Sequence, residues 1–112
     1  MPLTVRLSDQ ARVNILEIWV YIAENDNAVA ARMAATKIID KFGFLAENPN
    51  AGRFRRDLRA GIRSYPVGQY LIFYYLLEEL VVISRVVHGA RDLNALFESE
   101  PFDTFRMTED GG

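Results

Sequence analysis

Apolar and polar residues follow two different periods along this chain, and the first quarter already shows both. Residues 3–7 alternate between apolar and polar side chains, which predicts a short strand. From Ala11 the apolar positions recur every four and three residues, which makes one face of a helix. Ser8 stands before this helix as an N-cap, and Asp9 is well placed for the helix dipole. We therefore expect a strand followed directly by a helix.

A second helix is predicted over residues 28–46. Its apolar positions, which keep the helical spacing, are Ala31, Ala34, Ile38, Phe42 and Leu45. The turn-forming sequence "ENDN" at residues 24–27 separates it from the first helix and can cap it. Two helices joined by so short a turn form an antiparallel hairpin. Proline and glycine in "NPNAG", residues 48–52, then end the second helix.

The remaining sequence changes to the period of strands. Residues 58–63 alternate and predict a strand, and "YPVG" at residues 65–68 predicts a turn. Two runs rich in β-branched and aromatic residues, 70–77 and 80–87, flank Glu78–Glu79 and predict a hairpin. A Glu-Glu pair is poor chemistry for a two-residue primed turn, so a longer loop is the open alternative.

This order of elements predicts an α+β domain: an N-terminal strand, a helical hairpin, then a small, mostly antiparallel sheet with the helices on one face. A two-residue turn would place Tyr70, Ile72, Tyr74, Val81, Ile83 and Arg85 on one face of the sheet. The other face would carry Leu71, Phe73, Tyr75, Leu77, Val82 and Val86. Both faces are apolar, and the helical hairpin can cover one of them. The second is expected to be an exposed patch that marks a partner site, unless loops and the tail fold over it.

Composition sets the broad class of the chain. With 112 residues, half of them apolar, one domain over residues 1–97 is expected, followed by a loose acidic tail at 98–112. No cysteine is present, which suits a reducing compartment. The start lacks the basic and apolar stretches of a signal peptide, and the longest apolar run, 70–77, is too short for a membrane helix. A cytoplasmic protein without membrane contact is expected.

The net charge of −2 hides an uneven distribution. Residues 53–63, "RFRRDLRAGIR", sum to +4, whereas residues 98–112 sum to −4. In an extended chain Arg53, Arg55, Arg59 and Arg63 would point the same way. Because the guanidinium group binds both phosphate and carboxylate, we predict an anion-binding stripe for nucleic acid or an acidic partner. The alternative is an ordinary solvated face.

The highest density of candidate functional side chains is in "RVVHGARDL", residues 85–93, which contains the only histidine of the sequence, His88. One histidine and no cysteine argue against a zinc site, and no phosphate-loop, dinucleotide or nucleophile-elbow motif is present. Imidazole exchanges protons near neutrality, so His88 is a candidate general acid or base. With Arg63 and Arg85 to stabilise phosphate charge, it would support RNA cleavage. The alternative is a hydrogen-bonded histidine at a strand end.

Several fragments in order carry a family resemblance. They are "LS" with Ala11, "IWVYIAEN", "AVAARMAA", "ENPNAGR", "GIRSYPVGQYLIFYY" and "VVISRVVHGARDLNALF". Over roughly residues 3–97 the chain resembles the ParE toxins of the RelE/ParE superfamily, the toxin halves of bacterial type II toxin–antitoxin pairs. The last two fragments are the most specific.

The resemblance implies a cognate antitoxin, ParD-like and DNA-binding, whose C-terminal segment docks on the sheet and the adjoining groove to form a hetero-oligomer. An acidic antitoxin segment would meet the arginines of 53–63 electrostatically. The expected antitoxin- or target-binding residues are Arg55, Arg59, Arg63, Tyr70, Ile72, Tyr74, Arg85, His88 and Arg91.

The superfamily divides by activity. ParE-like members inhibit DNA gyrase by trapping its cleaved-DNA intermediate, which needs no catalytic residue, no cofactor and no sequence-specific nucleic-acid binding. RelE-like members cut messenger RNA on the ribosome with basic residues, for which Arg63, Arg85 and His88 are the candidates here. The chain has no lysine after Lys41, and its acidic tail suits a ribosomal RNA surface poorly. The resemblance therefore favours a gyrase inhibitor over an enzyme, and a non-toxic, antitoxin-binding relative is the third reading.

Overall fold

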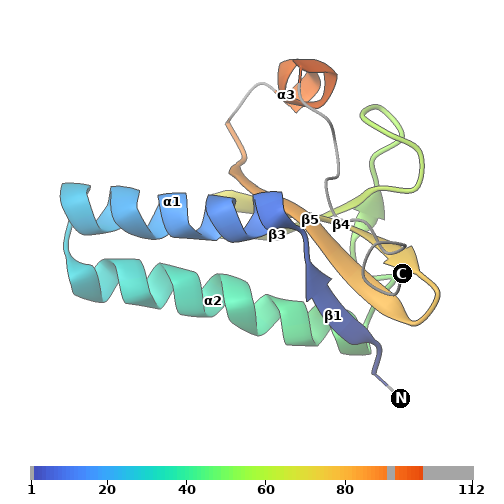
Figure 1. The fold of residues 1–112 in the computed structure, drawn as a ribbon, viewed down its shortest axis with the longest axis horizontal. Helices are drawn as coiled ribbons and strands as arrows, with labels where there is room; N and C mark the ends of the chain where they lie inside the picture. The colour runs from blue at the N-terminus through green and yellow to red at the C-terminus, as the bar shows by residue number, and fades with distance from the viewer. Residues whose placement is uncertain (1, 91–92, 100–112) are drawn as a thin grey trace.

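A computed structural model describes residues 2–90 and 93–99 (Figure 1). Its elements are β1 (Thr4–Leu7), α1 (Asp9–Asn25), α2 (Ala28–Glu47), β2 (Arg53–Phe54), β3 (Arg63–Val67), β4 (Tyr70–Leu77), β5 (Leu80–His88) and α3 (Leu93–Ser99). The predicted α+β class is confirmed. In the described part of the chain no helix is long and apolar enough to cross a membrane.

The five strands form one sheet in the order β1-β5-β4-β3-β2. β1 runs parallel to β5, and the other neighbours are antiparallel, as predicted for a mostly antiparallel sheet. The helices α1 and α2 lie side by side as a hairpin, while α3 stands apart from them on the far side of the sheet (Figure 1).

The caps of the two long helices explain where they begin. The Ser8 hydroxyl accepts a hydrogen bond from the Ala11 N–H at 3.0 Å, and the Asn27 side chain accepts one from the Ala30 N–H at 2.8 Å. Each bond satisfies one of the amide groups that a helix start leaves without an intrahelical partner. Ala11 and Ala31 are completely buried, so the faces predicted from the spacing are those that pack inward.

The turns differ in part from the prediction. Leu77 pairs with Leu80, so Glu78–Glu79 is a two-residue turn, as predicted. Glu78 adopts a φ of 56°, which residues other than glycine rarely take. The predicted turn at residues 65–68 is wrong: β3 continues through Val67, and the turn is made by Gly68, with a φ of 59°, and Gln69.

The strand predicted over residues 58–63 is also wrong. The Leu58 and Arg59 amides both donate to the Arg55 carbonyl, which coils the chain into tight turns. Gly61 then takes a φ of 82°, a conformation that glycine adopts without steric cost. Residues 55–62 are therefore a loop, and the strand starts at Arg63.

A β-bulge in β5 changes which residues share a face. Phe73 pairs with Arg85 and Tyr74 with Ile83, so Ser84 is the extra residue. As a result, Arg85 lies on the face of Phe73 and not on that of Tyr74, and Val86 moves to the helix-covered face. The predicted face assignment of these two residues is wrong, because it assumed an unbroken alternation.

Helix α1 supplies the hydrogen bonds that the bulge removes from the strand ladder. The Ser8 hydroxyl donates to the Ser84 carbonyl at 2.7 Å, and the Val86 N–H donates to the Asn14 side-chain oxygen at 3.1 Å. Both Ser8 and Asn14 are buried. Buried backbone polar groups need such partners, so α1 and the bulge stabilise each other.

Both faces of the sheet are covered. On one face the helices pack over a cluster that includes Ile38, Leu45, Ile72 and Ile83. On the other face Ile62, Phe73, Val87 and Leu96 form a second cluster, with Leu58, Leu71, Tyr75, Leu93 and Phe97 packed against it. The loop 55–62 and α3 thus cover the face that was predicted to be exposed. That prediction is wrong. A loop does cover the face, as the alternative proposed, but together with α3, and residues 100–112 of the tail lie outside the described residues.

Candidate functional site

The arginine-rich stretch 53–63, here called the basic segment, does not form the predicted stripe, because its middle is a loop and not an extended strand. Arg55 turns back onto Asp57 through two hydrogen bonds, of 3.1 Å from Nε and 3.0 Å from Nη2. This hydrogen bond lowers the pKa of the Asp57 carboxyl below its ordinary value of 3.8. The only carboxylate of the segment is therefore already paired.

Arg63 anchors the segment to the preceding turn. Its guanidinium donates to the Gly52 carbonyl at 2.7 Å and to the Asn50 side-chain oxygen at 3.2 Å, and it stacks 3.9 Å from the centre of the Phe54 ring. Arg56 lies over the same ring at 5.5 Å. The Phe54 ring thus contacts two guanidinium groups. One of them, that of Arg63, also donates hydrogen bonds to a backbone oxygen and to a side-chain amide oxygen.

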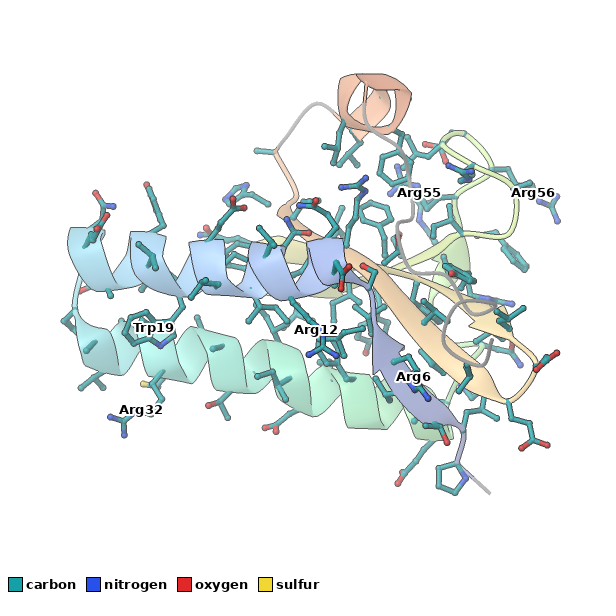
Figure 2. All side chains as sticks on the ribbon, viewed as in Figure 1. Arg6, Arg12, Trp19, Arg32, Arg55 and Arg56 are labelled. Carbon is teal, nitrogen blue, oxygen red and sulfur yellow. The ribbon has the colours of Figure 1, made fainter. Side chains whose placement is uncertain are left out.

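The charge that faces solvent comes from the remaining arginines. Arg53, Arg56 and Arg59 are exposed. Figure 2 shows Arg56 extending away from the body of the molecule, whereas Arg55 points toward the sheet below α3. Among the sequence candidates of this segment, Arg59 is exposed, whereas Arg55 and Arg63 are partly buried.

Ile72 and Tyr74 do not lie on the surface. Both are completely buried below the helices. The Tyr74 hydroxyl accepts a hydrogen bond from the Gly52 N–H at 2.7 Å and donates one to the Pro49 carbonyl at 2.9 Å. Burial raises the pKa of this phenol above its ordinary value of 10.0. In this conformation the two side chains hold the core together and offer a partner no surface.

The three residues considered for RNA cleavage are not brought together. Arg85 is 1 % exposed and lies on the α3 side of the sheet, opposite Phe73. Arg63 and His88 pair with Tyr74 and Tyr70, which are four positions apart on β4, a separation of about 13 Å along the strand. Arg91 lies outside the described residues.

His88 ends β5 in a small polar cluster. Its Nδ1 accepts a hydrogen bond from the Ala90 N–H at 3.1 Å, so the neutral ring carries its proton on Nε2, which lies 3.3 Å from Oε1 of Gln69. The ring also meets the edge of Tyr70, with the ring centres 5.6 Å apart. His88 is exposed, and its contacts are those of a histidine that fixes a strand end.

Two adjoining hollows meet beside this cluster and form what we call the interaction groove. They measure about 510 and 370 Å³ and share Tyr21, Gln69 and Tyr70. One extends between α1, α2 and the β3–β4 turn, past Met33 and Lys37. The other extends between α1 and the end of β5, to His88. Hollows of this size suit a ligand or a partner side chain.

Sequence reasoning found Tyr70 and His88 but missed the helical wall of this groove. Tyr21 is 65 % exposed although it sits in an apolar helix, and Met33 on α2 is exposed as well. The signal was present, since apolar residues surround α1 and α2 beyond the inward stripe. Only the folded chain shows that some of them face the β3–β4 turn. Among the described residues, no group of three or more histidine, cysteine or acidic side chains could hold a metal ion.

Comparison with known proteins gives the family. The model of the ParE toxin of the type II toxin–antitoxin system parDE matches residues 5–93. Toxin ParE3 of Caulobacter vibrioides is 35 % identical over 74 residues, which are 66 % of this chain and 74 % of the relative. Toxin ParE1 of the same organism is 29 % identical over 90 residues, covering 80 % and 93 % of the two chains.

Solved structures agree with this fold. A chain of the chromosomal ParDE system from P. aeruginosa has a TM-score of 0.69 at 15 % identity, covering 77 % of this chain and 95 % of that one. A chain of the RelBE2 toxin–antitoxin complex from Mycobacterium tuberculosis has a TM-score of 0.54 at 32 % identity, covering 79 % and 99 %. Since the family model spans most of the sequence, the chain belongs to the ParE toxins of type II toxin–antitoxin systems.

Proposed function

We propose that this ParE-type toxin inhibits DNA gyrase by binding and stabilising the cleaved-DNA intermediate, and that a cognate antitoxin holds it inactive. The observation that carries the proposal is the match to the ParE toxin model over residues 5–93. The two relatives from Caulobacter vibrioides carry the same toxin name. The proposed place of action is the cytoplasm.

The geometry supports inhibition by contact. Cleavage of RNA by acid–base chemistry needs a base and charge-stabilising groups within hydrogen-bond reach of one reacting phosphate. In the described structure Arg85 is buried on one side of the sheet, and Arg63 is tied to the turn at residues 50–52. His88 stands at the far end of β4 from Arg63. A binding protein needs no such convergence.

The interaction groove and the exposed arginines are the proposed contact surfaces. Tyr70 and His88 border the groove, and its apolar walls suit the side chains of a docking segment. The proposed antitoxin is ParD-like and DNA-binding, and it forms a hetero-oligomer with this chain. The similar solved structures, which come from the ParDE and RelBE2 toxin–antitoxin systems, support an antitoxin partner of this kind.

A ribosome-dependent nuclease is the second candidate function. It is favoured by one observation, the 32 % identity to a chain of the RelBE2 complex. On that account His88 would act as acid or base, with Arg63 and Arg85 stabilising phosphate charge, and a movement of the cover formed by α3 and the loop 55–62 would be needed to expose Arg85.

Growth inhibition by the chain expressed without its antitoxin tests the proposal in cells. We expect inhibition together with DNA breaks. We expect His88→Gln to keep most of both, because His88 is one of several residues that line the groove and glutamine keeps a hydrogen-bonding side chain. Tyr70→Gln is the matched comparison: it changes the residue that pairs with His88 on β4 and removes a groove side chain, but no imidazole. Loss of toxicity in His88→Gln alone, in a protein that is folded and still binds antitoxin, would instead favour the nuclease.

A harmless wild-type chain would support a third reading. If the purified chain is folded and binds an antitoxin but does not inhibit growth, it acts as a non-toxic, antitoxin-binding relative. Folding is checked by the cooperativity of urea unfolding.

A further inference from the structure

The acidic tail, residues 98–112, starts within the last turn of α3 and has a charge opposite to that of the basic segment. Residues 98–112 carry five acids and one arginine, a sum of −4, against +4 for residues 53–63. They also carry Phe102, Phe105 and Met107 between the acids. The family match ends at Leu93, the first residue of α3, so the rest of α3 and this acidic tail lie beyond the part shared with the ParE model.

Helix α3, which leads into the tail, packs directly against the basic segment. In α3, Leu96 and Phe97 pack in the same cluster as Leu58 and Ile62, which belong to the loop of the basic segment. The Phe97 ring lies 5.1 Å from the Phe73 ring, and the Arg55 guanidinium lies over that same Phe73 ring at 5.9 Å. Figure 1 shows α3 and the loop on the same side of the sheet.

The chain length beyond α3 is sufficient to bring acids onto the arginines. Asp103 follows Ser99 by four residues and Asp110 by eleven, which allows spans of up to about 13 and 36 Å. A segment tethered this close has an effective concentration on the order of millimolar, so several ion pairs that act together favour the contact where a single pair would not.

The basic segment has groups suited to receive these acids. Arg53 and Arg56 are exposed, and the structure records no hydrogen bond from either guanidinium to another described residue. Phe54 is 46 % exposed and offers an apolar edge between the arginines. Asp57, the only acid of the basic segment, already pairs with Arg55. The positive charge of Arg53 and Arg56 therefore remains for the carboxylates of the tail.

From these observations we infer that the acidic tail of this chain binds its own basic segment through Arg53 and Arg56. The tail screens the segment in the free protein, and an acidic partner that uses the same arginines must displace it. This inference holds whether the toxin acts on gyrase or on the ribosome.

A single spin label tests the contact in the full-length chain. Because the sequence has no cysteine, Thr108→Cys provides a unique attachment site in the tail. We expect the label to broaden the backbone amide signals of residues 53–59 selectively at low salt. The broadening should disappear in Arg53→Gln/Arg56→Gln and in about 1 M salt, where charges are screened within about 3 Å. A label at Asp26→Cys, in the turn between α1 and α2, is the control.

The result that would overturn the inference is equally specific. Broadening centred on the helices, spread evenly over the chain, or unchanged in Arg53→Gln/Arg56→Gln would each show that the tail does not bind the basic segment. Well-dispersed amide spectra of every variant show that the fold is intact, so loss of broadening is not read from an unfolded protein.

Binding of a poly-glutamate peptide measures whether the tail screens the basic segment from an acidic partner. A full-length variant with Glu100→Gln, Asp103→Asn, Glu109→Gln and Asp110→Asn should bind the peptide roughly threefold more tightly or better at low salt, the scale that several exposed ion pairs give. The charge-matched control neutralises four exposed acids elsewhere, Glu24, Asp40, Glu47 and Glu79. Equal affinity in the two variants would contradict screening by the tail.

Discussion

The two faces of the sheet are covered in different ways. One is packed beneath α1 and α2, two helices of 17 and 20 residues whose inward faces repeat at helical spacing. The other is covered by the seven-residue α3 and by the loop 55–62. The family match includes all of the first cover, but it ends at residue 93, where α3 begins. Of the second cover, the loop 55–62 thus lies within the family match, whereas α3 lies almost entirely beyond it.

This difference indicates where the chain is rigid and where it can open. A seven-residue helix is too short to be stable alone and depends on a few docked side chains, here Leu93, Leu96 and Phe97. The helix-covered face is instead fixed by both long helices and by the bonds from Ser8 and Asn14 to the bulge. We therefore expect stability to differ between the faces, with α3 opening more easily than the hairpin.

The largest predicted effect compares one leucine from each cover. Leu45→Ala removes a fully buried side chain of α2, and we expect it to lower the free energy of unfolding by about 2–5 kcal/mol. Leu96→Ala should cost clearly less, because α3 can detach without unfolding the rest. Urea unfolding measures both. Equal losses would mean that α3 is as integral to the fold as α2.

A smaller effect is predicted for the hydroxyl that joins the helix-covered core to the 49–52 turn. Tyr74→Phe leaves the buried Gly52 N–H and the Pro49 carbonyl without this partner, and should destabilise the protein by about 1–3 kcal/mol. Because burial raises the pKa of Tyr74, the neutral phenol contributes stability that is lost as the pH rises above 10.0. Tyr70→Phe is the control. If both variants unfold at the same urea concentration, the two hydrogen bonds contribute nothing.

The bond between α1 and the bulge should contribute somewhat less. Ser8→Ala removes both the cap of α1 and the donor to the Ser84 carbonyl, for an expected loss of about 0.5–2 kcal/mol. Asn27→Ala removes the cap of α2 and an exposed hydrogen bond to Asp26, and should cost less than Ser8→Ala. Thermal unfolding measures the loss of stability in each variant. A larger loss in Asn27→Ala than in Ser8→Ala would contradict the proposal that Ser8 stabilises the bulge.

The smallest effect lies on the α3 side, in the loop of the basic segment. The Arg55 hydrogen bond lowers the pKa of Asp57, so this pair stabilises the loop above pH 3.8 and is lost as the pH falls through the lowered value. Asp57 is fully exposed, and global stability should hardly change. The carboxyl carbon signal of Asp57 should titrate below 3.8, and Arg55→Gln should move the midpoint up. An unchanged midpoint would show that the pair is absent in solution.

The helix-covered half of the fold could be predicted from the sequence, because its signals are local. Ser8, Asn27 and the spacing of the inward alanines and leucines define both helices without tertiary information. The hairpin at Glu78–Glu79 was also predicted, although the residue types suit its turn poorly.

The α3-covered half could not be predicted in the same way. The alternation at 58–63 resembles a strand, yet turns around Arg55 and the positive φ of Gly61 make it a loop. On the helix-covered side, two features could not be predicted either. The bulge at Ser84 depends on bonds to residues more than 70 positions away in sequence. The groove requires α1 to fold onto the sheet, which brings Tyr21 and Tyr70 to the same hollow.

The proposed function is tested most directly with purified, antitoxin-free protein in two parallel reactions. One contains gyrase, ATP and plasmid, and is scored for supercoiling and for linear DNA. The other contains programmed ribosomes and is scored for cleavage of the message. We predict linear plasmid and intact message, which would assign the toxin to gyrase and leave His88 as a contact residue. Cut message with unaffected gyrase would contradict the account.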